Sequence, residues 1–395
     1  MRTVEEHQQV VAGLISARPA VTVPLADALG LALADDVVAP LSLPGFDNSA
    51  MDGYAVLAVD VAAASAENPV KLPVAEDIPA GRTDLLTLAP GTAHRIMTGA
   101  MLPAGATAVV PVESTDAATD IVSIFSSSSE GRHIRRAGED VTAGMTVLPA
   151  GEVLSPAALG LAAALGFAEL KVIPRQRVLV LSTGTELVTP GTPLQPGQIY
   201  ESNAVMLAAA LREAGADVIT APATSDDVAL FRETLAGHAK DVDLIVTTGG
   251  VSAGAYEVVK DALSGDVEFV KVAMQPGMPQ GAGTVNGTPI ITLPGNPVSA
   301  LVSFEVFIRP PLRAAMGLTA QRPRRSATLT EKLTSPAGKR QFRRGVVGTD
   351  DEVSSYGPPA SHHLRWLATA NCLLDIGEDV VELAAGSPVP VWDLS

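Results

Sequence analysis

The chain has 395 residues, of which 47% are hydrophobic and 18% charged, which is typical of a globular protein with several domains. Its formal net charge of −16 argues against general binding to nucleic acid or to anionic membranes. The single cysteine, Cys372, excludes an intrachain disulfide and a cysteine-rich zinc site.

The N-terminal region is expected to be helical. Residues 3–17 ("TVEEHQQVVAGLISA") place Val4, Val11, Leu14 and Ile15 at the spacing of an amphipathic helix. A second helical segment is predicted around residues 25–37 ("LADALGLALADDV"), directly after Pro24.

From about residue 44 to 140 the sequence changes to short strand-like runs between turns rich in Gly, Pro and Ser, such as "TAVVPVES" and "DIVSIFS". This span predicts a small, mainly β module inserted into the first domain. The run at 153–168, "VLSPAALGLAAALGFA", is slightly short for a membrane span. It predicts a buried helix with Ser155 as N-cap, Pro156 at the first helical position and Gly166 just past the end.

Residues 175 to about 320 alternate apolar strands with helices. The strand runs are "RVLVLSTG", "ADVITAPA", "DLIVTTGG" and "PIITLPGNP", and helical stretches lie between or after them. This alternation predicts a parallel sheet covered by helices on both faces. Short β segments return from about residue 325 to the end.

Three loops of the α/β region combine glycine with Ser or Thr where a strand ends: "LSTGTEL", "VTTGGVS" and "LPGNPVS". Ligands of open parallel sheets bind at this edge, and unpaired N–H groups at a helix start attract phosphate. The loops therefore predict a site for a phosphate-bearing ligand, although glycine turns also occur as simple turns. No GxGxxG, P-loop, HExxH or GxSxG motif is present.

Carboxylates stand close to these loops: Glu186, Asp226, Asp227 and Glu257. Beside a phosphate they favour Mg²⁺, which uses oxygen ligands from both protein and substrate. A helix N-cap explains Asp226 equally well on local grounds, whereas a turn gives little reason for a carboxylate at Glu186.

The β module has its own polar segment, "LPGFDNSAMDGYAV", which contains Asp47 and Asp52. A turn network accounts for its Asn-Ser pair better than for Asp52. In "IRRAGED", Arg135, Arg136 and Asp140 would either hold a module interface or face a ligand across a cleft.

The motifs "PGFDNSAMDGYAV", "RIMTGA", "IRRAGEDV", "STGTELV", "GQIYESN", "TTGGVSAG" and "LPGNPVSAL" occur in that order. Together they closely resemble the molybdopterin molybdenumtransferase (MoeA) family, which includes the E domain of gephyrin. The resemblance runs from about residue 4 to the C-terminus.

The charged start "MRTVEEHQQV" lacks the apolar core of a signal peptide, so a cytoplasmic location is expected. The resemblance implies an elongated homodimer of four-domain subunits. The expected domains are an N-terminal elongated helical domain (1–43 plus 141–174), the inserted mainly β module (44–140), a central three-layer α/β/α molybdopterin-binding domain (175–322) and a C-terminal β-barrel (323–395). The central domain would be MogA-like, related to the molybdopterin adenylyltransferases. The expected active cleft lies between the α/β domain of one subunit and the β module of the other.

The implied reaction takes adenylylated molybdopterin and molybdate, with Mg²⁺, and yields molybdenum cofactor and AMP. Because the dithiolene sulfurs belong to the substrate, one cysteine suffices. Contact with a molybdopterin adenylyltransferase that delivers the substrate is a further expectation.

The resemblance also implies roles for individual residues. The expected catalytic residues are Asp52, Asp140, Glu186, Asp226, Glu257 and Lys271, with Glu186 and Asp226 as Mg²⁺ ligands. The expected binding residues are Thr98, Arg135, Gly249, Gly250, Ser252, Pro294, Gly295, Asn296, Ser299, Arg344 and Ser361. Of these, Ser299, Arg344 and Ser361 are expected to contact an oxyanion or molybdate.

One segment departs from the family pattern. Many relatives read "KPGKP" where this chain reads "QPGMP", so Gln275 and Met278 replace two lysines while Lys271 remains. Three explanations stay open: Arg344 and nearby basic residues compensate, molybdate affinity is reduced, or the chain handles another substrate or metal, with tungstate one alternative.

Two other functions are less favoured. A related molybdopterin adenylyltransferase is disfavoured by the long flanking modules and their motifs. A non-catalytic molybdopterin-binding or scaffold protein is disfavoured because Glu186 and Asp226 are both retained.

Overall fold

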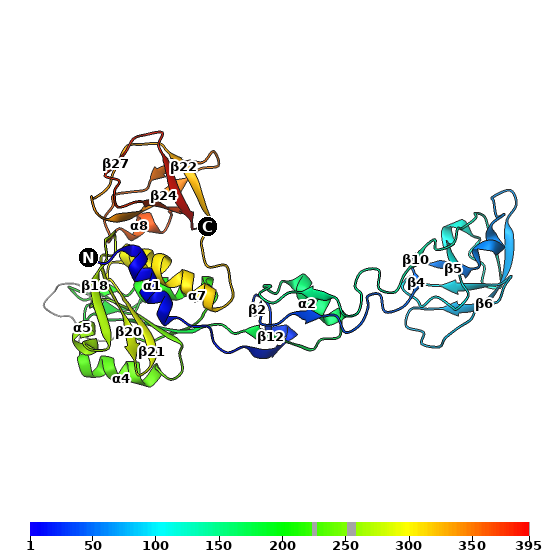
Figure 1. Cartoon of the computed structure of the whole chain (residues 1–395), viewed down its shortest axis with the longest axis horizontal. Helices are drawn as coiled ribbons and strands as arrows, with labels where there is room; N and C mark the ends of the chain where they lie inside the picture. Colours follow the sequence, from blue (N-terminus) through cyan, green and yellow to red (C-terminus); the bar gives the residue numbers. More distant parts are fainter. Residues whose placement is uncertain (223–226, 251–257, 395) are drawn as a thin grey trace. The chain divides into compact units, whose positions relative to one another are not determined.

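The computed structural model describes residues 1–222, 227–250 and 258–394. The chain forms two compact units (Figure 1). Unit 1 comprises Met1–Val23, Asp27–Ala34 and Lys171–Ser395, and unit 2 comprises Pro24–Ala26 and Asp35–Leu170. Whether these units divide further at the limits expected from the sequence stays a prediction.

Unit 1 is built on a six-stranded sheet. Its strands lie in the order β16 (Asp217–Thr220), β13 (Arg177–Ser182), β17 (Leu244–Thr248), β21 (Thr288–Leu293), β20 (Pro279–Val285) and β18 (Val267–Lys271). The first four are parallel, and all four were predicted from their apolar runs.

The four predicted strands are parallel as expected, and the structure adds two strands at one edge, β20 and β18, which are antiparallel to their neighbours. The cause is local. Asn286 and Gly287 join β20 to β21 with φ angles of 51° and 84°, and Val285 pairs directly with Thr288. Such a two-residue turn reverses the chain into a hairpin.

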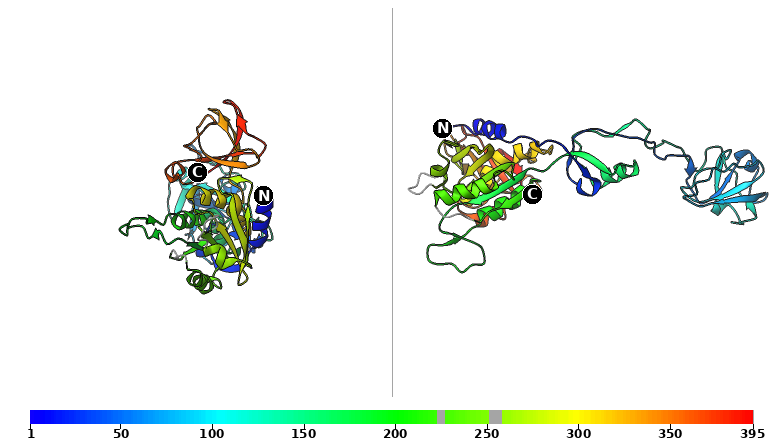
Figure 2. Two further views of the ribbon diagram at one scale, coloured as in Figure 1. Left: turned by 90° about the vertical axis from the view of Figure 1, so that its left-hand side faces the viewer. Right: turned by 90° about the horizontal axis from the view of Figure 1, so that it is seen from below.

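Helices cover both faces of this sheet (Figures 1 and 2). On one face, Val178 and Val180 pack in a common core with residues of α1 (Val4–Leu14), α3 (Asn203–Glu213), α6 (Pro297–Ser303), the π-helical η4 (Phe304–Ile308) and α7 (Arg309–Ala315). On the other face, Leu179 and Leu181 pack with α4 (Val228–His238) and α5 (Val258–Leu263). Alternate strand residues thus serve opposite faces, which explains why β13 reads as continuously apolar.

The first helix, α1, agrees with its prediction. Thr3 accepts a hydrogen bond from the Glu6 amide at 3.1 Å, and the Glu6 carboxylate accepts one from the Thr3 amide at 2.8 Å. This capping box satisfies amides that the helix itself leaves unpaired.

The second helix predicted around residues 25–37 is wrong. Only a 3₁₀ turn, η1 (Leu25–Asp27), forms there, followed by the short strands β2 (Ala32–Leu33) and β3 (Val37–Val38). Gly30, at φ 73°, ends any helical course. Ala32 and Leu33 then pair with β12 (Glu169–Ile173), which also pairs with β1 (Val21–Pro24), so pairing with a distant strand overrides the local helical spacing.

The C-terminal part of unit 1 is a closed barrel of five strands, as expected. The ring runs β24 (Arg340–Val347), β25 (Glu352–Ser355), β22 (Arg324–Leu329), β28 (Pro388–Asp393), β26 (Cys372–Ile376) and back to β24. A short strand before β20, β19 (Met274–Gln275), pairs with β24 and joins the barrel to the α/β part. Smaller elements complete the barrel: β23 (Leu333–Thr334), β27 (Glu382–Leu383) and α8 (Leu364–Leu367).

Unit 2 contains a five-stranded sheet in the order β8 (Ala108–Pro111), β5 (Gly53–Val56), β7 (Ala93–Ile96), β6 (Val70–Ile78) and β9 (Ile121–Ile124). Two smaller ladders pair β4 (Asn48–Ser49) with β10 (Ile134–Arg135) and β3 with β11 (Thr146–Leu148). Two 3₁₀ turns, η2 (Ala58–Val61) and η3 (Val112–Ser114), complete the unit's short elements.

The apolar run after residue 153 forms the predicted helix α2 (Pro156–Ala164). Ser155 caps it, and Gly166 follows with φ 86°. Nowhere in the described part of the chain does a helix combine the length and the hydropathy that crossing a membrane requires.

Candidate active site

A cavity of about 1130 Å³ opens in unit 1 at the carboxyl ends of its parallel strands. Its lining comes from the loops after β13, β17 and β21 and from most residues of three further segments, 199–203, 275–279 and 359–364. Because β13, β17 and β21 are neighbours in the sheet, their three predicted glycine loops meet at one place. The segment between β14 (Leu187–Val188) and β15 (Ile199–Tyr200), green in Figure 2, projects from the rest of unit 1 beside this cavity.

Gly249 allows the loops after β13 and β17 to approach each other closely, and Gly295 of the loop after β21 lies against it. Gly249 has φ 91°, and a Cβ there would lie 2.7 Å from the Thr183 carbonyl oxygen. A Cβ on Gly295 would lie 3.5 Å from the Gly249 Cα. A side chain at Gly249 would therefore clash, and the bare backbone is left to line the cavity.

Polar groups from distant parts of the sequence meet at the start of α6. The Asn296 side chain donates to the Ser361 hydroxyl at 2.9 Å, and the Val298 amide donates to the Ser361 carbonyl at 3.0 Å. Ser299, 4% exposed, lines the cavity beside them. The structure thus brings together Asn296, Ser299 and Ser361, three of the predicted binding residues.

The charges of the cavity wall are acidic. Glu186 and Glu201 line it, and among its described lining residues there is no Lys or Arg. Glu186 lies against Gly184, where a Cβ would come 2.7 Å from one carboxylate oxygen. The described residues contain no group of three or more His, Cys, Asp or Glu side chains suited to hold a metal. A lone carboxylate such as Glu186 still fits Mg²⁺, which is commonly bound through one or two carboxylates plus substrate oxygens.

Arg344 lies beside the cavity, and its guanidinium is engaged with backbone. It is 3% exposed and donates to the carbonyls of Pro358, Ala360 (3.3 Å) and His363 (3.1 Å). Burial lowers the pKa of this guanidinium. In this arrangement Arg344 holds the loop that carries Ser361.

Lys271, Gln275 and Met278, at or near the segment that departs from the family pattern, differ in their position relative to the cavity. Lys271 is the exposed last residue of β18 and is not among the described residues lining the cavity, and neither is Met278. Gln275 does line it, and its side-chain carbonyl accepts a hydrogen bond from Gln341 at 2.7 Å. Of the two replacements, only Gln275 faces the cavity.

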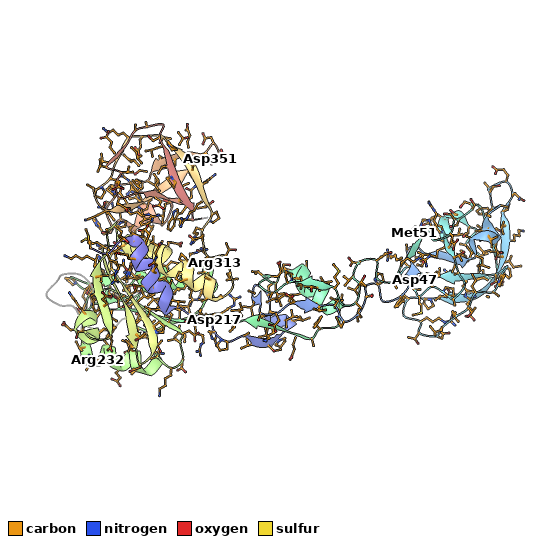
Figure 3. The ribbon with its side chains drawn as sticks, viewed as in Figure 1. Asp47, Met51, Asp217, Arg232, Arg313 and Asp351 are labelled. Atoms are coloured by element: carbon orange, nitrogen blue, oxygen red, sulfur yellow. The ribbon has the colours of Figure 1, made fainter. Side chains whose placement is uncertain are left out.

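In unit 2 the predicted residues Asp52 and Thr98 are in contact. One Asp52 oxygen accepts from both the amide and the hydroxyl of Thr98 at 2.6 Å, and these bonds lower the pKa of Asp52. Asp47, labelled in Figure 3, accepts from Arg136 at 2.6 Å and from the Ala137 amide at 2.8 Å. The Ala137 amide is the main cause of the lowered pKa of Asp47.

Arg135 and Asp140 are exposed in unit 2. The joining of this unit's residues with a cavity of another subunit stays a prediction. Three predicted residues, Asp226, Ser252 and Glu257, lie outside the described residues. Asp227, next to Asp226, is the N-cap of α4 and accepts from the amides of Ala229 and Leu230.

Sequence reasoning missed Glu201 and Asn203. Both line the cavity, Glu201 is 8% exposed, and Asn203 donates to the Gly295 carbonyl at 2.7 Å. Their segment, "IYESN", carried a signal only as a family motif, because neither its composition nor its spacing marks a site.

Comparison with known proteins agrees with this architecture along the whole chain. Residues 2–166 match the MoeA N-terminal region (domains I and II), residues 179–314 a probable molybdopterin-binding domain, and residues 326–394 the MoeA C-terminal region (domain IV). The class defined by the fold and the cavity is thus a molybdopterin-binding α/β domain flanked by further modules.

Curated relatives match over similar lengths. A protein of Mycobacterium tuberculosis named molybdopterin molybdenumtransferase 2 is 68% identical over 405 residues, covering 100% of both chains. Molybdopterin molybdenumtransferase of Haemophilus influenzae is 36% identical and covers 93% of this chain and 92% of its own. A crystal structure of the molybdopterin biosynthesis MoeA protein from Pyrococcus horikosii has a TM-score of 0.84 at 30% identity, covering 100% of this chain and 99% of that one. The chain belongs to the MoeA family.

Proposed function

We propose that this chain transfers molybdenum from molybdate to adenylylated molybdopterin and releases AMP. It is an enzyme of molybdenum cofactor biosynthesis, since its full-length relatives are molybdopterin molybdenumtransferases. The observation that carries the proposal is the cavity where the loops after β13, β17 and β21 meet. The matches to MoeA regions on both sides of the α/β domain disfavour a simple adenylyltransferase.

The cavity suits the phosphates of such a substrate. Backbone at Gly249, Gly250 and Gly295 is free of side chains, and Asn296, Ser299 and Ser361 add polar hydrogens. Pro294 lies at the same edge. Preorganised donors of this kind stabilise the charge that develops when a phosphoanhydride opens.

We propose Mg²⁺ as the counter-charge. With no Lys or Arg among the described lining residues, the polyanionic substrate would otherwise face two carboxylates. Glu186 would hold the ion, together with Asp226, and the bound ion would neutralise phosphate oxygens and stabilise the leaving AMP. Glu257 remains a proposed catalytic residue and Ser252 a proposed binding residue, as the family resemblance implies.

For molybdate we propose contact with Ser299 and Ser361, positioned by Arg344. A tetrahedral dianion suits hydroxyl donors. Because Arg344 is engaged with three carbonyls and Gln275 is neutral, the arrangement supports reduced molybdate affinity over compensation by Arg344.

We also propose that the chain acts as a cytoplasmic homodimer, with Asp52, Thr98, Arg135 and Asp140 completing the cavity of the partner. Lys271 would be a further catalytic residue of the completed site. A molybdopterin adenylyltransferase would deliver the substrate by transient contact.

The test is AMP release by the purified protein from adenylylated molybdopterin with Mg²⁺, with and without micromolar molybdate. The proposal predicts molybdate-dependent release that chelation of the divalent ion abolishes. Release that ignores molybdate would indicate a hydrolase. Tight pterin binding without release would indicate a binding protein.

A further inference from the structure

Glu201 is a buried carboxylate at the cavity that the proposed reaction leaves without a role. It stands between β15 and α3, is 8% exposed and lines the cavity. A charged group this deeply buried is retained at a cost, which its hydrogen bonds must offset.

One oxygen of Glu201 accepts two hydrogen bonds. The Ser182 hydroxyl donates to Oε1 at 2.8 Å, and the Ala204 amide donates to the same atom at 2.7 Å. Ser182 is the last residue of β13, whereas Ala204 lies in the first turn of α3. Glu201 therefore ties the end of a central strand to the start of a helix.

The hydrogen bonds continue from Ser182 to Thr248 on the neighbouring strand β17. Which of the two hydroxyls donates follows from the bond between Ser182 and Glu201. Ser182 and Thr248 lie 3.0 Å apart between their hydroxyl oxygens. Because Ser182 gives its only hydroxyl proton to Glu201, Thr248 must be the donor to Ser182. Thr248 and Ser182 are each 1% exposed, so water does not compete for these bonds.

Thr248 sits where the cavity loops meet. Its carbonyl accepts from the Thr183 amide at 3.1 Å, and the next residue, Gly249, donates its amide to the Leu293 carbonyl at 3.2 Å. The relay from Glu201 thus reaches the loops after β13, β17 and β21. A shift of Thr248 would move the glycine turn that lines the cavity.

Glu201 also occupies a position that an anion would seek. The first amides of α3 attract negative charge, and Glu201 takes the Ala204 amide for itself. A substrate phosphate is thereby directed away from α3 and toward the backbone at Gly250 and Gly295.

We propose that Glu201 is a positioning residue of this active site: through Ser182 and Thr248 it sets the glycine turn after β17 against the substrate phosphate. The inference rests on the proposed function for the identity of that phosphate. It assigns Glu201 the role of hydrogen-bond acceptor, with no contact to the reacting atoms.

The experiment compares Glu201→Gln with Glu201→Ala in the full chain. A carboxamide oxygen still accepts from Ser182 and Ala204, so Glu201→Gln should keep KM for adenylylated molybdopterin within about threefold of wild type. Glu201→Ala should raise this KM about tenfold or more, with a smaller change in kcat, because the binding loop loses its support. Ser182→Ala should raise KM as well, and the double variant should be no worse than the more impaired single variant.

Thr288→Ala supplies the matched control for lost stability. Thr288 is a buried hydroxyl that donates to the Ala239 carbonyl at 2.8 Å, at the opposite end of β21 from the cavity. It should lower Tm without changing KM.

The other outcomes overturn the positioning role. Equal loss in Glu201→Gln and Glu201→Ala would mean that the charge itself binds metal or substrate. A KM unchanged in Glu201→Ala, or a rise matched by Thr288→Ala, would make the relay purely structural. Should wild type itself fail to bind adenylylated molybdopterin, the proposed function would fall first.

Discussion

Glu186 is the residue at which the structure and the proposed use of Mg²⁺ meet. Its carboxylate belongs to the loop after β13, and the residue lines the cavity. Glu186→Gln should lower molybdate-dependent AMP release on the order of 100-fold, since one preorganised electrostatic partner of the phosphates is lost. Steady-state rates across a Mg²⁺ titration measure this, with Glu233→Gln, an exposed carboxylate of α4, as the control. An unchanged rate and Mg²⁺ dependence would remove Glu186 from the metal site.

Arg344 should matter through the loop it holds. Arg344→Ala leaves three carbonyls of the 358–363 segment without their donor, so we expect a loss of stability of about 2–4 kcal/mol and a higher KM for molybdate. Thermal unfolding and KM together check this. Normal Tm with a large loss of molybdate binding would instead assign Arg344 to direct contact.

The two replaced lysine positions should respond differently. Gln275→Lys places a cation at the cavity wall and should tighten molybdate binding about tenfold, the equivalent of one charge-assisted hydrogen bond of about 1.4 kcal/mol. Met278→Lys should have no such effect, because Met278 is not among the described lining residues. Equal gains in both variants would contradict this difference in position between Gln275 and Met278.

Among single residues, those in the loops directly after the strands could be predicted from the sequence. Gly249, Gly250, Asn296 and Ser299 follow strands in the expected manner. Ser361 was predicted only from the family resemblance, since no local pattern brings it to Asn296, 65 residues away. Glu201 was missed because its partner Ser182 comes from another element.

Among the elements, α1 carries a group that should make unit 1 sensitive to acid. His7 is fully buried against Phe307, with ring centroids 4.7 Å apart, and neither ring nitrogen has a hydrogen-bond partner. Burial, and then the charge of Arg2, lower the pKa of His7 from 6.5 to about 4. The folded state therefore disfavours the imidazolium.

The sign of the effect follows directly. Above pH 6.5 His7 is neutral in both states and the shift has no effect on stability. As pH falls toward 4, only the unfolded chain takes up the proton, so unit 1 loses about 3 kcal/mol. Between pH 8 and pH 4.5, the free energy of unfolding should fall less in His7→Leu than in wild type. The value of each protein at pH 8 serves as its reference. Denaturant unfolding at pH 8 and pH 4.5 measures this. An equal fall in the free energy of unfolding in wild type and His7→Leu would contradict the assignment of the acid sensitivity to His7.

Element prediction succeeded where local signals decide. The caps of α1 and α2 are set by Thr3, Glu6 and Ser155, within one turn of the residues they serve. It failed at residues 25–37, where pairing of Ala32 and Leu33 with β12 depends on residues about 140 positions away. The Asn286–Gly287 hairpin did carry a local signal, and reading it would have predicted the antiparallel edge.

For the whole molecule, two compact units predict two separable unfolding events. Ile124 belongs to the core of unit 2 and Ile245 to that of unit 1, both fully buried. Each Ile→Ala change should cost about 2–5 kcal/mol and shift one calorimetric transition while leaving the other in place. A single transition shifted by both variants would contradict the division.

Insertion of molybdenum at the cavity of unit 1 is the central claim. The most direct measurement is a single turnover in which AMP and pterin-bound molybdenum are quantified together, from adenylylated molybdopterin, Mg²⁺ and molybdate. We expect both products to form in equal amounts, and both to form on the order of 100-fold more slowly in Glu186→Gln. AMP formed without pterin-bound molybdenum, or no AMP at all, would contradict the claim.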